Sequence, residues 1–184
     1  YGLSQKIMSE FNLHIIDNFL PNDVYTKILN SITDIAWDPL NHVYDYKKTE
    51  KLEPKHVWFS QGIDMDGFFA KEIKNCINKS GSFTIKNFNL LSFTMATKVD
   101  PFPHRDGPVK GKYNRQMVLY IDGANDINKG TGFYVKNDNQ YDLNTHIGFR
   151  KNRAVLFNAG MWHSPLLFAS QDSAPRISII AQFI

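Results

Sequence analysis

The 184-residue chain has a single cysteine, Cys76. Within one chain this excludes an internal disulfide framework, zinc fingers and thiolate clusters. No apolar run reaches the roughly 18 residues that a membrane-spanning helix needs. The first dozen residues also lack the regions of a secretory signal peptide. We therefore expect a cytoplasmic protein without a membrane partner.

Charge of one sign is not concentrated anywhere in the chain. The formal net charge is +3, and the lysines are scattered, for example at 47–48 and 110–112. A nucleic-acid-binding protein would carry its basic residues clustered on one element, so we expect no nucleic-acid partner. The sequence also lacks a glycine-rich phosphate-binding loop. No pattern indicates the oligomeric state.

The composition is that of one folded domain, with 42% hydrophobic and 14% aromatic residues. In residues 1–81 the pattern predicts a short strand within 13–20 and then a helix over 21–32, capped by Asn22 or Asp23. A polar, aromatic stretch from 37 to 55 predicts an irregular loop. A second helix is predicted over 65–78, with its apolar stripe at Phe68, Phe69, Ile73 and Ile77.

After residue 82 the pattern changes to short runs of β-branched and aromatic residues separated by turn residues. These runs are FNLLSFTMAT, RQMVLYID, TGFYVK, THIGF, RAVLFN and RISIIAQF. Many short strands at even spacing are typical of a sandwich, a barrel or a jelly roll. We expect one α+β domain over 1–184, mainly β, with 1–81 flanking a β core at 82–184 because two helices alone would not close a core.

Three residues have the character of metal ligands. His104 and Asp106 are two positions apart, so extended backbone would point both side chains to one face. His163 follows far enough along the chain to come from a distant strand. Two imidazoles and one carboxylate form the facial triad of non-haem Fe(II) oxygenases. The alternative is a surface histidine beside a turn aspartate, with a packed or exposed histidine after Trp162.

Arg176 begins a strand that is otherwise apolar. A buried guanidinium is costly unless it is paired or reaches an anion, and it fits a carboxylate well. Ser178 points to the same face and would add a donor. The alternative is a simple ion pair between Arg176 and Asp172.

These motifs resemble the 2-oxoglutarate- and Fe(II)-dependent oxygenases, and most closely their prolyl-hydroxylase-like branch. In that family His-x-Asp is followed, after a long gap, by His and then Arg-x-Ser; here the three read HRD, MWH and RIS. The segments IIDNFLPNDVYTKIL, RQMVLYID, GTGFYVK and RAVLFNAGMWHSP resemble further family segments. The resemblance covers most of the chain and implies a double-stranded β-helix, the cupin-like jelly roll, at 82–184.

The resemblance also implies the residues of the site. His104, Asp106 and His163 would bind Fe(II) and form the catalytic centre. The cosubstrates would be 2-oxoglutarate and O2, the co-products succinate and CO2, and the product a hydroxylated peptide side chain or small molecule.

The cosubstrate contacts implied by the resemblance are Arg176, Ser178 and Tyr120. Arg176 would pair with the distal carboxylate of 2-oxoglutarate, Ser178 would lie nearby, and Tyr120 would add its hydroxyl. The alternative for Tyr120 is an aromatic residue of the sheet core.

The sequence departs from the family pattern in two places. A Gly-Gly pair is replaced by Gly130-Thr131-Gly132. A tyrosine common before the first histidine is replaced by Met95, between Thr94 and Thr97, which leaves one side of the cosubstrate pocket unassigned. The aromatic 37–60 segment would form either a lid or a loop held by its own aromatic side chains.

Two other functions compete with the oxygenase. A metal-binding cupin enzyme would use no 2-oxoglutarate, and the Arg-x-Ser pair argues against it. A non-enzymatic jelly-roll binding module would hold no metal and would scatter the three ligand side chains. The fold alone does not separate these functions.

Overall fold

The structure of the chain is a computed structural model, which describes residues 13–40, 58–96, 103–107, 114–124, 128–138, 140–166 and 175–184. Two α-helices are present there, α2 (Asn22–Ser31) and α3 (Phe68–Lys79), with a 3-10 turn η1 (Ile32–Asp34). The strands are β1 (His14–Ile16), β2 (Asp38–Leu40), β3 (Trp58–Gly62), β4 (Phe88–Ala96), β5 (Arg115–Asp122), β6 (Gly130–Asn137), β7 (Gln140–Gly148), β8 (Arg153–Asn158), β9 (Trp162–Leu166) and β10 (Arg176–Phe183).

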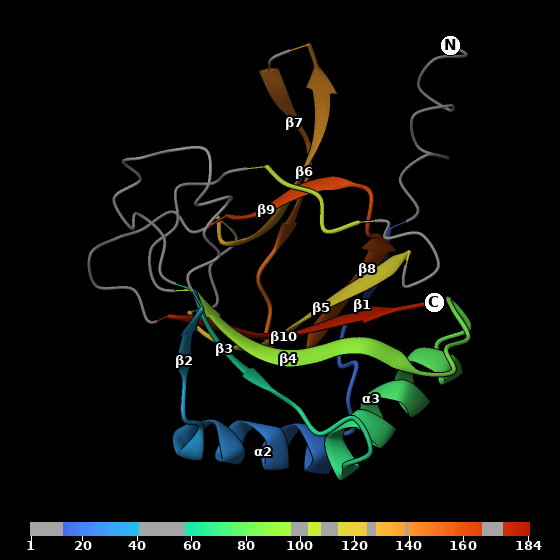
Figure 1. Cartoon of the computed structure of the whole chain (residues 1–184), viewed down its shortest axis with the longest axis vertical. Coiled ribbons are helices and arrows are strands. Elements are labelled where there is room, and N and C mark those ends of the chain that lie inside the picture. The colour runs from blue at the N-terminus through green and yellow to red at the C-terminus, as the bar shows by residue number, and fades with distance from the viewer. Residues whose placement is uncertain are drawn as a thin grey trace.

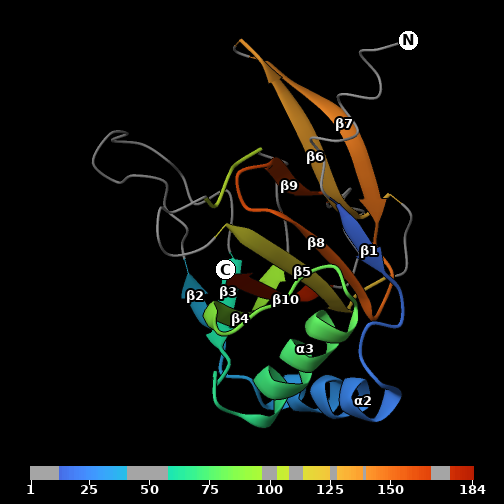
Figure 2. The same ribbon diagram turned by 90° about the vertical axis from the view of Figure 1, so that its right-hand side faces the viewer.

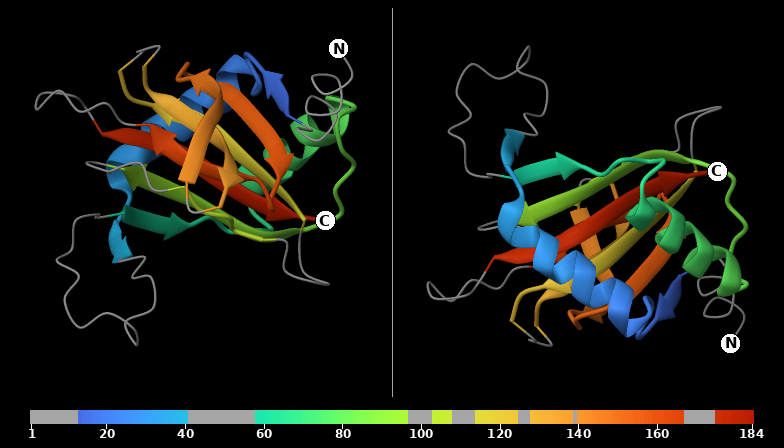
Figure 3. Two further views of the ribbon diagram at one scale, coloured as in Figure 1. Left: turned by 90° about the horizontal axis from the view of Figure 1, so that it is seen from above. Right: turned by 90° about the horizontal axis from the view of Figure 1, so that it is seen from below.

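The strands form two antiparallel sheets (Figure 1). The larger sheet has seven strands in the order β1-β8-β5-β10-β4-β3-β2, and the smaller has three in the order β7-β6-β9. Both helices cross one face of the larger sheet, and the smaller sheet lies over its other face (Figures 2 and 3). This arrangement confirms the predicted jelly roll with N-terminal flanking helices.

Alternation along the central strands divides the core in two. On β5, the side chains of Met117, Leu119 and Ile121 are fully buried and pack toward the helices. The intervening Val118 and Tyr120 belong to a second cluster, on the side of the smaller sheet. Successive side chains of a strand point to opposite faces, so both faces of this sheet are covered. The face away from the helices carries the residues of the predicted site.

The helix predicted over 21–32 is confirmed by α2, but its predicted cap is wrong. The residue before the helix is Pro21, in an extended conformation, and neither Asn22 nor Asp23 caps it through a side chain. Asn22 is already the first helical residue. Proline has its φ fixed near the value it shows here, which provides an entry to the helix without a side-chain oxygen.

The second predicted helix is confirmed with a shifted start. Helix α3 begins at Phe68 after Gly67, and its buried residues are Ala70, Ile73 and Ile77. Phe68 is 49% exposed, so its place in the predicted apolar stripe is wrong. As the first helical residue it lies outside the buried stripe, and the Lys27 ammonium lies 5.0 Å from its ring centroid.

Part of the segment predicted as an irregular loop is a strand. Residues 38–40 form β2, which pairs with β3 at the edge of the larger sheet. Residues 41–57 lie outside the described residues, so the alternatives of a lid and a pinned loop stay open. Strand β9, which carries His163, was not predicted as a separate strand. The described residues include no helix with the length and apolar character needed to cross a membrane.

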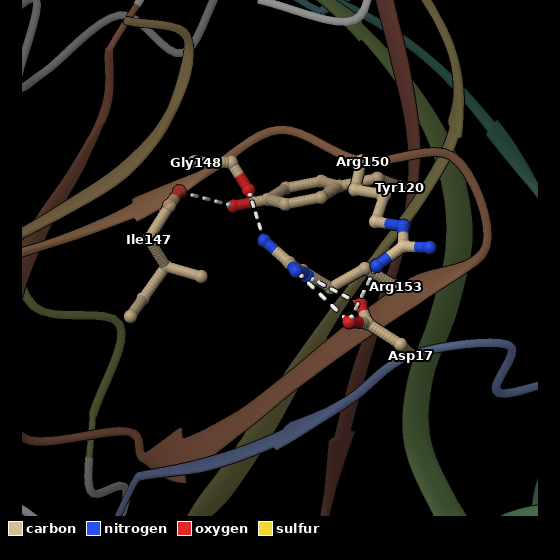
Figure 4. Close-up of polar contacts among 6 residues, drawn as sticks. All are labelled: Asp17, Tyr120, Ile147, Gly148, Arg150 and Arg153. Atoms are coloured by element: carbon tan, nitrogen blue, oxygen red, sulfur yellow. Dashed lines mark hydrogen bonds and ion pairs between the residues drawn. The ribbon is translucent and has the colours of Figure 1, made fainter. Parts of the chain in front are cut away.

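Arg153 connects Asp17, the residue after β1, with strands of both sheets (Figure 4). Arg153 donates from Nε and Nη2 to the two carboxylate oxygens of Asp17, at 2.6 and 3.0 Å. Its Nη1 donates to the carbonyl of Gly148 at 2.8 Å. Arg150 donates to the same carboxylate at 3.0 Å. The paired, charge-assisted geometry is favourable, and it holds β1 against β8 and the end of β7.

We predict that Asp17→Asn destabilises the fold in a pH-dependent way. The hydrogen bond from Arg153 holds the pKa of Asp17 below its ordinary value. The stabilisation is therefore complete above the unfolded-state pKa near 4 and is lost as pH falls through the lowered folded-state pKa. Because 34% of the Asp17 side chain is exposed, we expect a loss of only about 1 kcal/mol at pH 7.

The measurement is thermal unfolding by circular dichroism at pH 7 and at pH 3. The difference in Tm between the native chain and the variant should shrink at the lower pH. Asp34→Asn is the control, because Asp34 makes no ion pair within the described residues. An equal Tm difference at both pH values would contradict the assignment.

Candidate metal and cosubstrate site

Main-chain pairing brings the two predicted histidine ligands together. His104 and His163 form an isolated antiparallel bridge. The N–H of each donates to the carbonyl of the other, both at 2.9 Å. Residues directly opposite on antiparallel strands project their side chains to the same side. Their imidazole centroids are accordingly 4.5 Å apart.

Asp106 completes the cluster from two positions after His104. Its Oδ1 lies 3.8 Å from His104 Nε2, and its Oδ2 lies 3.3 Å from His163 Nε2. One ligand atom from each residue lies within 4.8 Å of the others. Ligands about 2.1 Å from a common ion are themselves separated by about 3.0–3.4 Å. The three side chains therefore have the spacing of a metal site.

The protein orients His163 through its other ring nitrogen. Nδ1 lies 2.9 Å from the carbonyl oxygen of Met161, where a protonated Nδ1 donates to it. Nε2 then faces Asp106, and a second hydrogen bond of this kind is typical of histidine ligands. Only 4% of His163 is exposed, and the Phe157 ring packs against it with centroids 4.9 Å apart.

Asp106 is ionised at neutral pH. Burial raises the pKa of its carboxyl group, but this is outweighed by the hydrogen bond and charge of His163, the charge of His104 and a hydrogen bond from Gln116, which lower it to about 2. A carboxylate with two imidazoles suits Fe(II) and leaves coordination positions open.

Gln116 is a residue of this site that the sequence analysis missed. It is fully buried on β5, and its Nε2 donates to Asp106 Oδ2 at 2.6 Å and lies 3.4 Å from His163 Nε2. Gln182 Nε2 donates to the side-chain oxygen Oε1 of Gln116 at 3.4 Å. The only signal in the sequence is an amide among the apolar residues of β5. The hydrogen bond from Gln116 Nε2 fixes the Asp106 carboxylate in place.

Arg176 lies at a second, buried part of the same cavity. It is 5% exposed, and its Nη1 donates to the carbonyl of Gly130. Among the described residues, its Nε has no hydrogen-bond partner, and neither does Ser178 Oγ. Burial lowers the pKa of Arg176, but a guanidinium keeps its charge in proteins. These two unpaired donors, one of them on the buried cation itself, fit an incoming carboxylate. The alternative partner, Asp172, lies outside the described residues.

Tyr120 has its hydroxyl already engaged. It lies 2.7 Å from Thr131 Oγ1 and donates to the carbonyl of Ile147 at 3.4 Å. Its ring stacks on Phe149, and the Arg176 guanidinium lies 5.6 Å from the ring centroid. Burial raises the pKa of Tyr120, so the hydroxyl keeps its proton. Tyr120 is thus a core aromatic that supports Arg176, and a contact with the cosubstrate stays a prediction.

One cavity of about 400 Å³ connects these groups. It is lined by the three predicted metal ligands, by Arg176 and by residues of β3, β4 and β10. Thr94 lines the cavity, while the neighbouring Met95 packs into the core under the helices. Thr94 rather than Met95 is therefore the residue of this pair that faces the cavity, and Thr97 lies outside the described residues.

Hydroxyl-bearing residues cross four neighbouring strands at this level of the sheet. Ser60 pairs with Thr94, Thr94 with Ser178, and Ser178 with Tyr120.

Arg105 points the other way from the two ligands that flank it, and its guanidinium lies 4.5 Å from the Trp162 ring centroid. His104 and Asp106 line the cavity and Arg105 does not, as strand alternation predicts.

Solved structures with this architecture are numerous. A Pseudomonas putida prolyl-4-hydroxylase matches with a TM-score of 0.56 and 14% identity over 97% of this chain and 95% of that chain. A Trichoplax adhaerens prolyl hydroxylase, solved with a peptide fragment of the hypoxia-inducible factor oxygen degradation domain, matches with a TM-score of 0.58 and 15% identity over 97% and 86%. HygX from Streptomyces hygroscopicus, with nickel, 2-oxoglutarate and hygromycin B bound, matches with a TM-score of 0.64 and 9% identity over 100% and 86%.

The chain has the fold of the 2-oxoglutarate- and Fe(II)-dependent oxygenases. No protein-family model matches the sequence, and no curated protein matches it either. In this fold His104, Asp106, His163 and Arg176 line one cavity, and Ser178 lies two residues after Arg176 on the same strand. The structure thus brings together the predicted metal ligands and the predicted carboxylate-binding residues.

We predict that Gln116→Leu weakens metal binding at the His-Asp-His cluster by about tenfold, because outer hydrogen bonds orient ligands. The measurement is isothermal titration with Ni(II), with folding checked by circular dichroism. Gln140→Leu, at an exposed position on β7, is the control. An unchanged Ni(II) affinity in a folded Gln116 variant would contradict a positioning role.

Proposed function

We propose that the chain is an Fe(II)- and 2-oxoglutarate-dependent dioxygenase that hydroxylates a peptide side chain or a small molecule and releases succinate and CO2. The observation that carries this proposal is the shared cavity. At one part of it two imidazoles and a carboxylate converge within 4.8 Å, and Arg176 lines another part, with an Nε that has no hydrogen-bond partner among the described residues.

The residues present fit both absent groups. His104, Asp106 and His163 would hold Fe(II), which supplies activation of O2 when it is bound with 2-oxoglutarate. Arg176 and Ser178 would hold the distal carboxylate of 2-oxoglutarate through their orphaned donors. The ring of Tyr120 packs under the Arg176 guanidinium and helps to keep it in place. The protein supplies orientation, charge and exclusion of water.

Two substrate classes fit this proposal. The Trichoplax enzyme is described with a peptide fragment, and HygX with hygromycin B. A cavity of about 400 Å³ admits either one side chain or a small molecule. The cytoplasmic location and the lack of a nucleic-acid partner stay predictions, as does the organisation of 1–184 as one domain.

The two rival functions predict different structures. A binding module predicts scattered ligand side chains, whereas here the three ligand atoms are clustered. A cupin without 2-oxoglutarate gives no reason for a buried arginine whose Nε lacks a hydrogen-bond partner in the part of the chain that the structure describes. Measuring succinate separates the two metal-dependent functions, because the proposed dioxygenase forms succinate and a cupin without 2-oxoglutarate does not.

We predict that His163→Ala abolishes metal binding at low micromolar iron, because it removes one of only three ligands that the cluster provides. His104→Ala should behave in the same way. The measurement is anaerobic Fe(II) titration together with succinate formation from 2-oxoglutarate. His14→Gln is the control, because His14 lies on β1 and does not line the cavity. Full 2-oxoglutarate turnover in His163→Ala would show the ligand assignment to be wrong.

We predict that Arg176→Met raises the Kd for 2-oxoglutarate by about two orders of magnitude, since it removes a buried charge-assisted pair worth about 3 kcal/mol. Binding of Ni(II) should be unaffected. Both are measured by titration calorimetry, with Arg150→Met as the control because Arg150 lies on the surface beside Asp17. Unchanged 2-oxoglutarate affinity would instead favour the cupin without this cosubstrate.

A further inference from the structure

A second hollow adjoins the cavity of the proposed oxygenase site. Its volume is about 430 Å³, and it lies between the turn before α3 and the start of β4. Met65 lines both this hollow and the cavity that contains His104, Asp106 and His163. The two spaces are therefore neighbours that share one side chain as a wall.

The hollow is positively charged. Lys71 and Lys74, on one face of α3, and Lys86, just before β4, line it together with a single acidic residue, Asp66. None of the three lysines forms an ion pair with another described residue. Like charges at this helical spacing are mutually unfavourable, so a bound anionic group would relieve a repulsion already present in the fold.

Two large apolar side chains at the cavity are exposed. Met65, which lines both the cavity and the hollow, is 49% exposed, and Leu90, which lines the cavity, is 37% exposed. Exposed apolar side chains that lie together mark an interaction surface. Here they line the cavity, where a bound substrate would contact them.

The first residues of β4 also have an edge that no described strand covers. Strand β3 ends at Gly62, which pairs with Ser92, and the N–H of Ile63 donates to the carbonyl of Leu91. The part of β4 before Leu91 continues beyond that point and borders the hollow through Phe88. An open strand edge can pair with an extended polypeptide.

We propose that the hollow binds an acidic segment of a polypeptide substrate, adjacent to the residue that enters the cavity; this rests on the proposed function. The lysines pair with the carboxylates of the segment, Met65 and Leu90 contact its apolar side chains, and the open edge of β4 accommodates its extended main chain. The phosphates of a nucleic acid would also pair with the lysines, but a nucleic acid has no apolar side chains to contact Met65 and Leu90 and no extended peptide main chain to pair with β4.

The test is fluorescence anisotropy with a fluorescein-labelled peptide of alternating glutamate and leucine, added to the whole chain with and without Ni(II) and 2-oxoglutarate. The triple variant Lys71→Gln/Lys74→Gln/Lys86→Gln should bind it about tenfold more weakly, and native binding should weaken with added salt. The control triple variant Lys79→Gln/Lys136→Gln/Lys151→Gln loses the same charge elsewhere and should bind like the native chain.

Equal affinity of the hollow variant and the native chain, with both folded, would overturn the proposal. An equal loss of peptide affinity in the control triple variant would also overturn it, because binding would then depend only on the net charge of the chain. Tighter hollow-dependent binding of a single-stranded oligonucleotide, or full displacement of the peptide by millimolar inorganic phosphate, would also overturn it in favour of another anion. A glutamine-for-glutamate peptide that does not bind would support it.

The proposed function is assessed separately in the same samples. The hollow variant should keep Ni(II) binding and peptide-independent 2-oxoglutarate turnover, since its lysines do not line the metal cavity. If the native chain binds the acidic peptide through the hollow but neither binds metal nor forms succinate, the oxygenase proposal fails and the acidic-peptide site stands.

Discussion

The reciprocal main-chain pairing of His104 with His163 is the constraint on which the rest of the site depends. These two hydrogen bonds, each 2.9 Å, are followed by one from the N–H of Gly107 to the carbonyl of Ala159 at 3.0 Å. They attach the short segment that carries His104 and Asp106 to the far end of the chain. Since His163 lies far along the chain from the segment that carries the other two ligands, no local preference could assemble the three. The pairing fixes the direction of both histidines before any ion binds.

The larger sheet separates stability from chemistry by strand alternation. On β10, Ile177, Ile179 and Ala181 are buried against the helices, whereas Arg176, Ile180 and Gln182 line the cavity. Each apolar residue of the first set removes surface from water on the helical face, worth about 2 kcal/mol for a large aliphatic side chain. That contribution lets the other face hold a buried cation and orphaned donors, which the core alone would not favour. A one-residue slip of β10 would exchange the two sets.

The sequence was most informative where many side chains repeat one pattern. The predicted bounds of β5, β8 and β10 agree with the structure because each is an apolar run between turn residues. Strand β2 was missed because three residues are too few for a period to be visible. The His-x-Asp and Arg-x-Ser spacings indicated side chains on a common face, and the fold brings them to one cavity. Gln116 could not be found in this way, because its role depends on a hydrogen bond to Asp106, which lies outside both sheets, rather than on a spacing.

The departure at Gly130-Thr131-Gly132 can be explained by packing. Gly130 has a φ of +141°, and a Cβ there would lie 2.0 Å from the carbonyl oxygen of Ile147, so only glycine fits. This close approach lets the Gly130 carbonyl accept from Arg176. Thr131 faces inward instead, and its hydroxyl lies 2.7 Å from that of Tyr120. The segment therefore keeps glycine where the backbone requires it and adds a hydroxyl where the buried tyrosine needs a partner. The carbonyl of Gly130 and the ring of Tyr120 together hold the guanidinium, while its buried Nε has no hydrogen-bond partner among the described residues.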